Sequence, residues 1–114
     1  MKPSHLLLLL PLSMPPGARA DDFPTSGRVE YVLECMQQHA GKHEYLYKCS
    51  CMVDRIAREL SYDDFVAMSV AARNQNLAGE RGGLFRDAAS ARDMAGKYRE
   101  IEAGARQACA VPQR

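Results

Sequence analysis

The segment from Glu44 to Leu60, EYLYKCSCMVDRIAREL, decides the fold. Its apolar residues recur at steps of three and four, which places their side chains on one face of an α-helix. That face consists of Leu46, Cys49, Val53, Ile56 and Leu60. We therefore predict a helix over about residues 44–60, with the rest of the chain packed against this face.

The same period continues on both sides of this segment and predicts three more helices. One covers about residues 28–40 and ends at Gly41, with an apolar face of Val29, Val32, Leu33, Met36 and Ala40. Another follows Ser61, the expected N-cap, to about residue 76, with an inner face of Phe65, Val66, Met68, Ser69 and Ala72. The last covers about residues 88–109, has an alanine-rich face that includes Tyr98 and Ile101, and stops at Pro112. Because no strand-like alternation occurs, the predicted fold is all-α, a small four-helix domain.

Four cysteines, Cys35, Cys49, Cys51 and Cys109, indicate two disulfides that staple this domain. Residues two apart on a helix point about 200° apart, so Cys49 and Cys51 cannot bond each other without distorting the helix. Matching the apolar faces favours the pairs Cys49–Cys109 and Cys35–Cys51. The pairs Cys35–Cys49 and Cys51–Cys109 remain open as the alternative.

The N-terminal residues have the parts of an export signal. Lys2 precedes a leucine run from Leu6 to Leu10, helix breakers follow, and Ala18-Arg19-Ala20 matches a peptidase site. The domain plan is therefore a signal peptide over 1–20, an extended arm over 21–27, a helical domain over 28–110 and a tail over 111–114. We expect a mature protein of about 94 residues in the periplasm or secreted, with no membrane insertion after cleavage.

The charge of the mature chain excludes some partners. Without Lys2 and Arg19, 13 basic and 14 acidic residues remain, a net charge of −1. Such a chain has no basic footprint for nucleic acid or for anionic membranes. No cofactor motif occurs, and no nucleophile, base and orienting group stand at a spacing that supports catalysis. We therefore expect a binding protein rather than an enzyme, with another periplasmic protein as its partner.

Two segments are candidates for contacting that partner. The stretch from Gly79 to Asp87 combines flexible glycines, charges of both signs and an apolar pair, and its candidate contacts are Glu80, Arg81, Leu84, Phe85 and Arg86. Tyr45 and Tyr47 flank the apolar face of the helix over 44–60, so at least one of them should be partly exposed. The alternative for the glycine-rich stretch is a connector whose Leu84 and Phe85 cover the core.

A second hypothesis is a metal or thiol-redox carrier. Cys35 and His39 are one helical turn apart, and with His43 and Cys51 (or Cys49) they form a Cys/His cluster of the kind that binds zinc or copper. A disulfide sulfur is not a thiolate ligand, so this hypothesis requires free thiols.

Three segments together resemble a known group of proteins: Tyr31 to Met36, Tyr47 to Cys51 with Asp54 to Ala57, and Gly79 to Asp87. They are similar to small exported helical proteins that accompany quinoprotein (PQQ-dependent) methanol dehydrogenase systems in bacteria. The resemblance implies a periplasmic accessory protein for alcohol oxidation, and it assigns no catalytic residue.

Overall fold

The computed structural model describes residues 22–75 and 89–113. They form four helices, α1 (Thr25–Gln37), α2 (Glu44–Glu59), α3 (Tyr62–Asn74) and α5 (Ala89–Ala108), and no strand. The predicted all-α, four-helix class is confirmed. The expected signal peptide lies outside the described residues.

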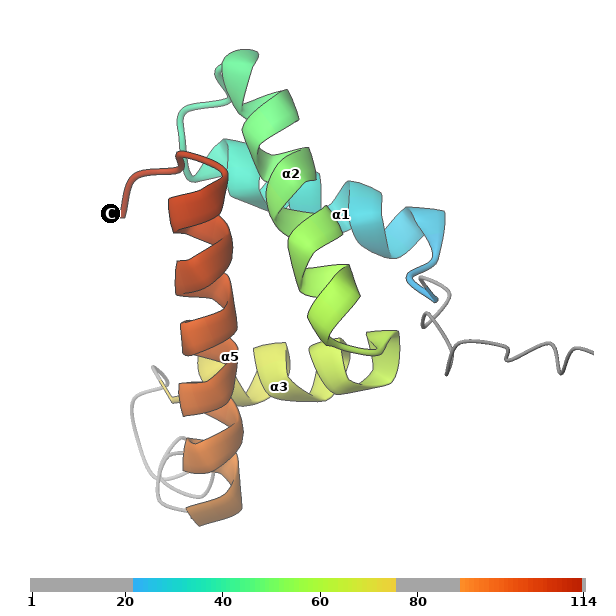
Figure 1. Ribbon diagram of the computed structural model, residues 1–114, viewed down its shortest axis with the longest axis vertical. Helices are drawn as coiled ribbons and strands as arrows, with labels where there is room; N and C mark the ends of the chain where they lie inside the picture. Colours follow the sequence, from blue (N-terminus) through green and yellow to red (C-terminus); the bar gives the residue numbers. More distant parts are fainter. Residues whose placement is uncertain (1–21, 76–88, 114) are drawn as a thin grey trace, which may run out of the picture.

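The four helices do not form a regular parallel bundle. α2 and α5 lie alongside each other, α1 crosses α2, and α3 runs from the lower end of α2 past the middle of α5 (Figure 1). α5 packs on both α2 and α3, and α1 packs on α2. Within the described part of the chain, the backbone of α1 approaches neither α3 nor α5. A gap therefore remains between α1 and the other two helices, and only side chains bridge it.

The N-terminal arm is shorter than the sequence predicts, because α1 begins at Thr25 rather than near residue 28. Pro24 is extended with its φ at −64°, and its carbonyl accepts the first helical hydrogen bond from Arg28 N–H at 3.1 Å. Proline's fixed φ suits this helix-initiating position. Before it, Phe23 is buried against Tyr62 and Phe65. The arm is thereby docked on the start of α3.

A tight reversal joins α1 to α2. α1 ends at Gln37, and the next residues turn through Ala40 (φ 58°) and Gly41 (φ 65°), both left-handed. Gly41 N–H donates to the Met36 carbonyl at 2.9 Å, which closes the end of the helix. Gly41 thus acts as the predicted stop, since glycine adopts this conformation without steric cost, although the last helical residue is Gln37 rather than Ala40.

The chain bends between α2 and α3 where the sequence predicts it. Leu60 is extended (φ −123°, ψ 144°), and Ser61 follows as the N-cap, its hydroxyl accepting a hydrogen bond from Asp64 N–H at 3.2 Å. Asp22 of the N-terminal arm accepts from Tyr62 N–H at 3.0 Å. Two of the free backbone donors at the start of α3 are thus satisfied, and Asp63 and Asp64 lie where the helix dipole favours acids.

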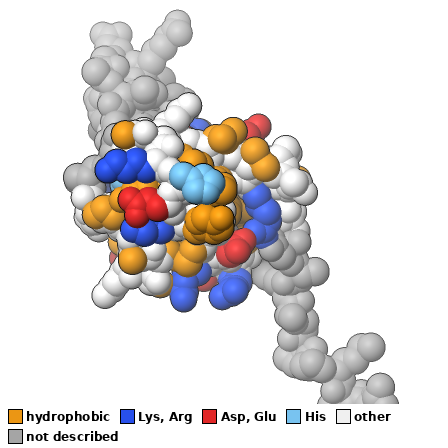
Figure 2. All heavy atoms as spheres, turned by 90° about the horizontal axis from the view of Figure 1, so that it is seen from above, with side chains coloured by type: hydrophobic (Ala, Val, Ile, Leu, Met, Phe, Trp, Pro, Cys, Tyr) orange, Lys and Arg blue, Asp and Glu red, His pale blue; other side chains and the backbone are white. Residues whose placement is uncertain are grey.

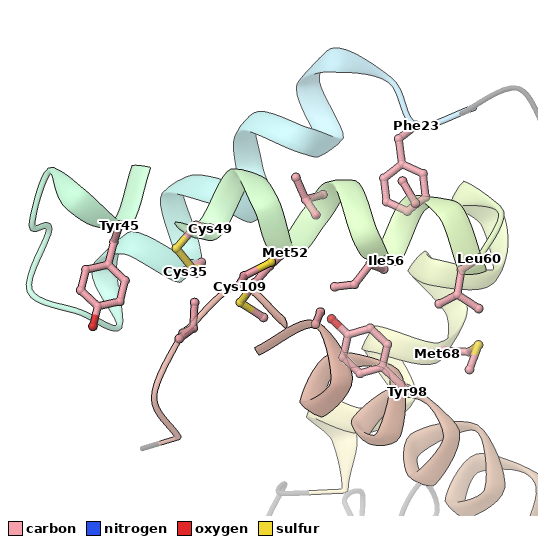
Figure 3. Packing of buried hydrophobic residues seen from close by; sticks show 14 residues of the cluster. Phe23, Cys35, Tyr45, Cys49, Met52, Ile56, Leu60, Met68, Tyr98 and Cys109 are labelled. Atoms are coloured by element: carbon pink, nitrogen blue, oxygen red, sulfur yellow. A yellow bond between two sulfur atoms is a disulfide. The ribbon is translucent and has the colours of Figure 1, made fainter. Parts of the chain in front are cut away.

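The core is centred on the predicted face of α2. Cys49, Met52 and Ile56 are fully buried there, and Tyr98 of α5 reaches toward them (Figure 3). Ala95 and Ala105 of α5 are also buried, as the alanine-rich face predicts. One residue of the predicted face is misplaced, because Leu46 lies near the free end of α2 and is 36% exposed.

The predicted apolar face of α1 is wrong at two positions, while Val32 and Met36 of that face pack against the core. Val29 and Leu33 are 50% and 56% exposed, whereas Gly27 and Cys35 are buried. Two contacts fix the rotation of this helix: the disulfide from Cys35 and the close approach of Gly27 to the Tyr62 ring. These contacts outweigh the burial that a rotation toward Val29 and Leu33 would gain.

The disulfides connect Cys35 with Cys49 and Cys51 with Cys109, so the favoured pairing was wrong and the alternative holds. Cys49 and Cys51 do point in different directions, as the helix rotation requires. The error was in which neighbour each one meets. α1 packs on the side of α2 that carries Cys49, while the end of α5 reaches the flank that carries Cys51. α2 is therefore covalently joined to α1 on one side and to α5 on the other.

Candidate functional site

The gap between α1, α3 and α5 forms a groove with a volume of about 540 Å³. This volume lies in the range of sites that hold small ligands or short peptide segments. The lining residues of α1 are Gly27, Glu30, Tyr31, Glu34, Cys35 and Gln38; those of the α3 segment are Tyr62, Phe65, Val66, Ser69, Val70, Ala72 and Arg73; and those of α5 are Tyr98, Arg99, Glu102 and Arg106. We refer to this feature as the three-helix groove.

Aromatic rings line the inside of the groove. The ring centroids of Tyr31 and Phe65 are 6.1 Å apart, and those of Phe65 and Tyr98 are also 6.1 Å apart, so one ring from each helix contributes to a single cluster. Burial raises the pKa of Tyr31 above its ordinary value, and nearby Tyr98 and Glu102 raise it further. Burial, followed by Glu102, likewise raises the pKa of Tyr98. Both side chains are therefore neutral phenols at physiological pH and can donate hydrogen bonds.

Ion pairs span and border the groove. Arg73 of α3 donates to Glu34 of α1 at 2.7 Å, which links the two helices whose backbones do not meet. Both side chains are more than half exposed, so this link contributes only about 0–1 kcal/mol. Within α5, Arg106 Nη2 donates to Glu102 Oε1 at 2.6 Å, and this pair is mostly buried.

One buried hydrogen-bond donor on the α5 wall has no acceptor among the described residues. Arg106 Nη1 is buried and has no hydrogen-bond partner among the described residues. A buried donor without a partner costs about 1–3 kcal/mol, and more when it is charged. Arg99 also lines the groove from α5 and makes no ion pair with any residue of the described ranges. The α5 wall thus offers guanidinium donors that the protein itself leaves unused.

The hydroxyl of Ser69 is the groove's one aliphatic hydroxyl, and it serves the fold. Ser69 is buried, and its Oγ donates to the Val66 carbonyl at 3.1 Å within its own helix. No histidine belongs to the groove lining. The described lining therefore has no serine–histidine pair. It presents aromatic surface, neutral phenols and charged side chains, some of which are paired.

Of the predicted partner contacts, Tyr45 and Tyr47 do not belong to the groove lining. Glu80, Arg81, Leu84, Phe85 and Arg86 are outside the described residues. Tyr47 is 69% exposed, whereas Tyr45 is buried, with its ring stacked on His39 at 4.1 Å between centroids. The prediction that at least one of the two tyrosines is partly exposed is confirmed by Tyr47, whereas the choice of Tyr45 as a surface contact is wrong.

Tyr47 lies at the end of the molecule where α1 turns into α2. Its ring meets the edge of His43 at 5.8 Å, and Lys48 lies over the Tyr45 ring at 5.0 Å. Figure 2 looks onto this end and shows histidine against hydrophobic side chains, with charged side chains of both signs around them. The exposed tyrosine Tyr47 belongs to this end.

The alternative metal site loses its sulfur ligands. Cys35 and Cys51 each belong to a disulfide, His39 stacks on Tyr45, and His43 meets the Tyr47 ring in an edge-to-face contact. The part of the chain that the structure describes contains no group of three or more His, Cys, Asp or Glu placed to hold a metal ion. Its cysteines are all disulfide-bonded, so the Cys/His cluster of the sequence is divided between the two staples.

Sequence reasoning did not identify the three-helix groove. The groove residues of α5, Tyr98, Glu102 and Arg106, recur every four residues, which was a visible signal of a polar stripe beside the alanine-rich face. That polar stripe indicates a groove only when the distance between α1 and α5 is known. The packing of the helices creates the groove, and no single helix carries its pattern.

The disulfides indicate that the chain belongs in an oxidising compartment outside the cytosol. None of the helices in residues 22–75 and 89–113 has the length and apolar character needed to cross a membrane. No protein-family model, curated protein or solved structure matches this chain. Its function is therefore argued from the geometry of the groove and from the sequence features described above.

Proposed function

We propose that this protein is an exported, non-catalytic accessory protein that binds another periplasmic protein through the three-helix groove. The observation that carries the proposal is the groove itself: three helices contribute one aromatic ring each, and unused guanidinium donors lie beside them. A cleaved signal over residues 1–20 is the expected route of export, and the two disulfides suit that destination.

The rim of the groove supports a protein partner. Val66 and Val70, one turn apart on α3, line the groove and are 41% and 44% exposed. Partly exposed apolar residues beside aromatic rings and charged groups are typical of the centre and rim of protein interfaces. A partner segment would cover these valines and complete the burial that the domain leaves unfinished.

The resemblance to accessory proteins of methanol oxidation identifies the first partner to test, a periplasmic quinoprotein alcohol dehydrogenase. In this role the protein assists or docks on the enzyme and performs no chemistry of its own.

The test compares two valine substitutions with opposite locations. Val70→Glu places a charge on the groove rim, and Val29→Glu places the same charge on the exposed outer side of α1. With the dehydrogenase from the same bacterium immobilised on a sensor, we expect V70E to weaken binding at least tenfold and V29E to leave it within twofold. The reverse order would move the interface to the outer side of α1, and no binding by the wild type would remove this partner.

A photo-crosslinking residue in living cells extends the test to partners other than the dehydrogenase. Placed at position 70, it should give one discrete adduct with another exported protein, and placed at position 29 it should give none. Equal yields of adduct from both positions would show random encounters with other proteins rather than specific binding at the groove.

A further inference from the structure

The unused donors of the three-helix groove indicate what its ligand must carry. Arg106 Nη2 is engaged by Glu102, but Nη1 is buried without a partner among the described residues. This atom is enclosed, so an acceptor oxygen of a ligand reaches it only when the Arg106 side chain turns toward the groove that it lines. Guanidinium groups bind carboxylates with particular strength, because two N–H groups can meet two oxygens.

The charge of the α5 wall favours an anion. Arg99 and Arg106 are seven residues apart, two helical turns, and both line the groove, while the single acid of this wall, Glu102, is already paired with Arg106. On the opposite side, Arg73 and Glu34 neutralise each other, and Glu30 of α1 adds a negative charge to the lining. The excess positive charge is thus local to α5, and a carboxylate is the complementary group.

A second hollow continues past this wall. It has a volume of about 280 Å³, includes Gln113 of the C-terminal segment, and shares Arg99, Glu102 and Arg106 with the groove. The two hollows therefore meet along the row of charged residues on α5. An elongated ligand could cross this row with its carboxylate on the arginines, whereas a compact one would use the groove alone.

The remainder of the ligand is apolar, since the rings of Tyr31, Phe65 and Tyr98 and the rim valines face the groove. The geometry points to an extended peptide segment of the partner in which an acidic side chain lies next to an aromatic or branched apolar one. The carboxylate is held by Arg106 and Arg99, and the neighbouring side chain packs on the aromatic cluster. This inference rests on the proposed function and names the chemistry of its site.

The test uses two blocked pentapeptides that differ in one group, acetyl-Ala-Phe-Glu-Val-Ala-amide and the same peptide with Gln in place of Glu. They are titrated into the disulfide-bonded protein labelled with ¹⁵N, and backbone amide shifts are followed. We expect the Glu peptide to shift amides of α3 and of α5 around 99–106 and to bind at least fivefold more tightly than the Gln peptide. Equal affinity of the two peptides would overturn the inference that the ligand carries a carboxylate.

Variants assign that preference to the α5 wall. In Arg106→Gln the two peptides should bind equally, and in Arg99→Gln the preference should fall about threefold. Arg92→Gln, on an exposed part of α5 outside the groove lining, should retain the full preference. Arg99 is exposed, so its variant provides a result even if loss of the buried Arg106 prevents folding. An unchanged preference in R99Q and R106Q would contradict the assignment.

Two further outcomes separate this inference from its premise. If V70E weakens the partner while the peptides show no preference, the groove is the interface but the ligand needs no carboxylate. If 3-phenylpropionate binds as tightly as the Glu peptide, the peptide backbone contributes nothing to the affinity. That result would overturn the inference that the groove binds a peptide segment.

Discussion

α1 has two very different neighbours. On the side of α2 it is packed, disulfide-bonded and joined by the ion pair between Arg28 and Asp54. On the side of α3 and α5 its backbone stands away, and the groove with its charged rim takes the place of a packed seam. The comparison teaches that the covalent staples allow a small domain to remain folded while leaving one inter-helix space open. The following tests probe first the closed seam and then the open one.

Removing a disulfide should have the largest effect, and the two should differ. The Cys51–Cys109 bridge closes a separation of 58 residues, and the Cys35–Cys49 bridge closes one of 14. Loop-closure entropy assigns losses of about 4 and about 3 kcal/mol to their removal, respectively. Urea denaturation of C51S/C109S and C35S/C49S measures both values.

The same variants check the connectivity. Each should contain no free thiol, because the remaining two cysteines are partners. Cys35→Ser combined with Cys51→Ser should instead leave Cys49 and Cys109 unpaired in the folded protein. Two free thiols in either of the first pair of variants would contradict the observed bridges.

Gly27→Ala should disturb the closed end of the α1–α3 gap. A Cβ atom there would lie 2.7 Å from Tyr62 Cε2, so the ring or the helix must shift. We expect a loss of about 1–3 kcal/mol from this overpacking. Gly104→Ala is the matched control, because no atom lies within 4 Å of its Cβ position. There the higher helix propensity of alanine should stabilise the protein by about 0.5–1 kcal/mol, and an equal loss in both variants would show that Tyr62 is not the cause.

Alkaline pH should weaken the open side through its tyrosines. Burial raises the pKa of Tyr31 and Tyr98 above the ordinary value of 10.0 in the folded chain, so the folded protein holds these protons more tightly than the unfolded one. Their influence on stability is therefore constant below about pH 10 and becomes destabilising as the pH rises above it.

Each tyrosine should contribute a slope of about 1 kcal/mol per pH unit in that range. Denaturation between pH 8 and 11 of the wild type and of Tyr31→Phe/Tyr98→Phe measures it. The double variant should lose stability less steeply, and identical slopes would place the responsible groups outside the groove.

The smallest effect should come from the ion pair across the gap. Arg73 and Glu34 are mostly exposed, so a double-mutant cycle with Arg73→Gln and Glu34→Gln should give a coupling below about 1 kcal/mol that falls with added salt. A coupling of several kcal/mol would mean that this pair, rather than the staples, holds the groove at its observed width.

The helices and their punctuation were readable because they depend on local physics. Ser61 caps α3, Gly41 ends the α1 turn, and the period of Cys49, Val53 and Ile56 marks the core face of α2. The local pattern did not predict which side of α1 is buried, because contacts with other parts of the chain decide it. Val29 and Leu33 share a helical face, but Gly27 and Cys35 decide which side of α1 is buried.

An all-α chain with two disulfides was predictable from the amino-acid sequence, because helix period, capping and cysteine number are properties of short segments. The pairing of the cysteines was not predictable in this way, because it depends on the side from which α1 and α5 approach α2 in the folded protein. The tertiary structure likewise decided the groove, since three helices distant in sequence must stand apart by a fixed amount for Tyr31, Phe65 and Tyr98 to share one space. Spacing along a chain sets the direction of each side chain from its own helix axis, and the relative placement of the axes is what turns those directions into a site.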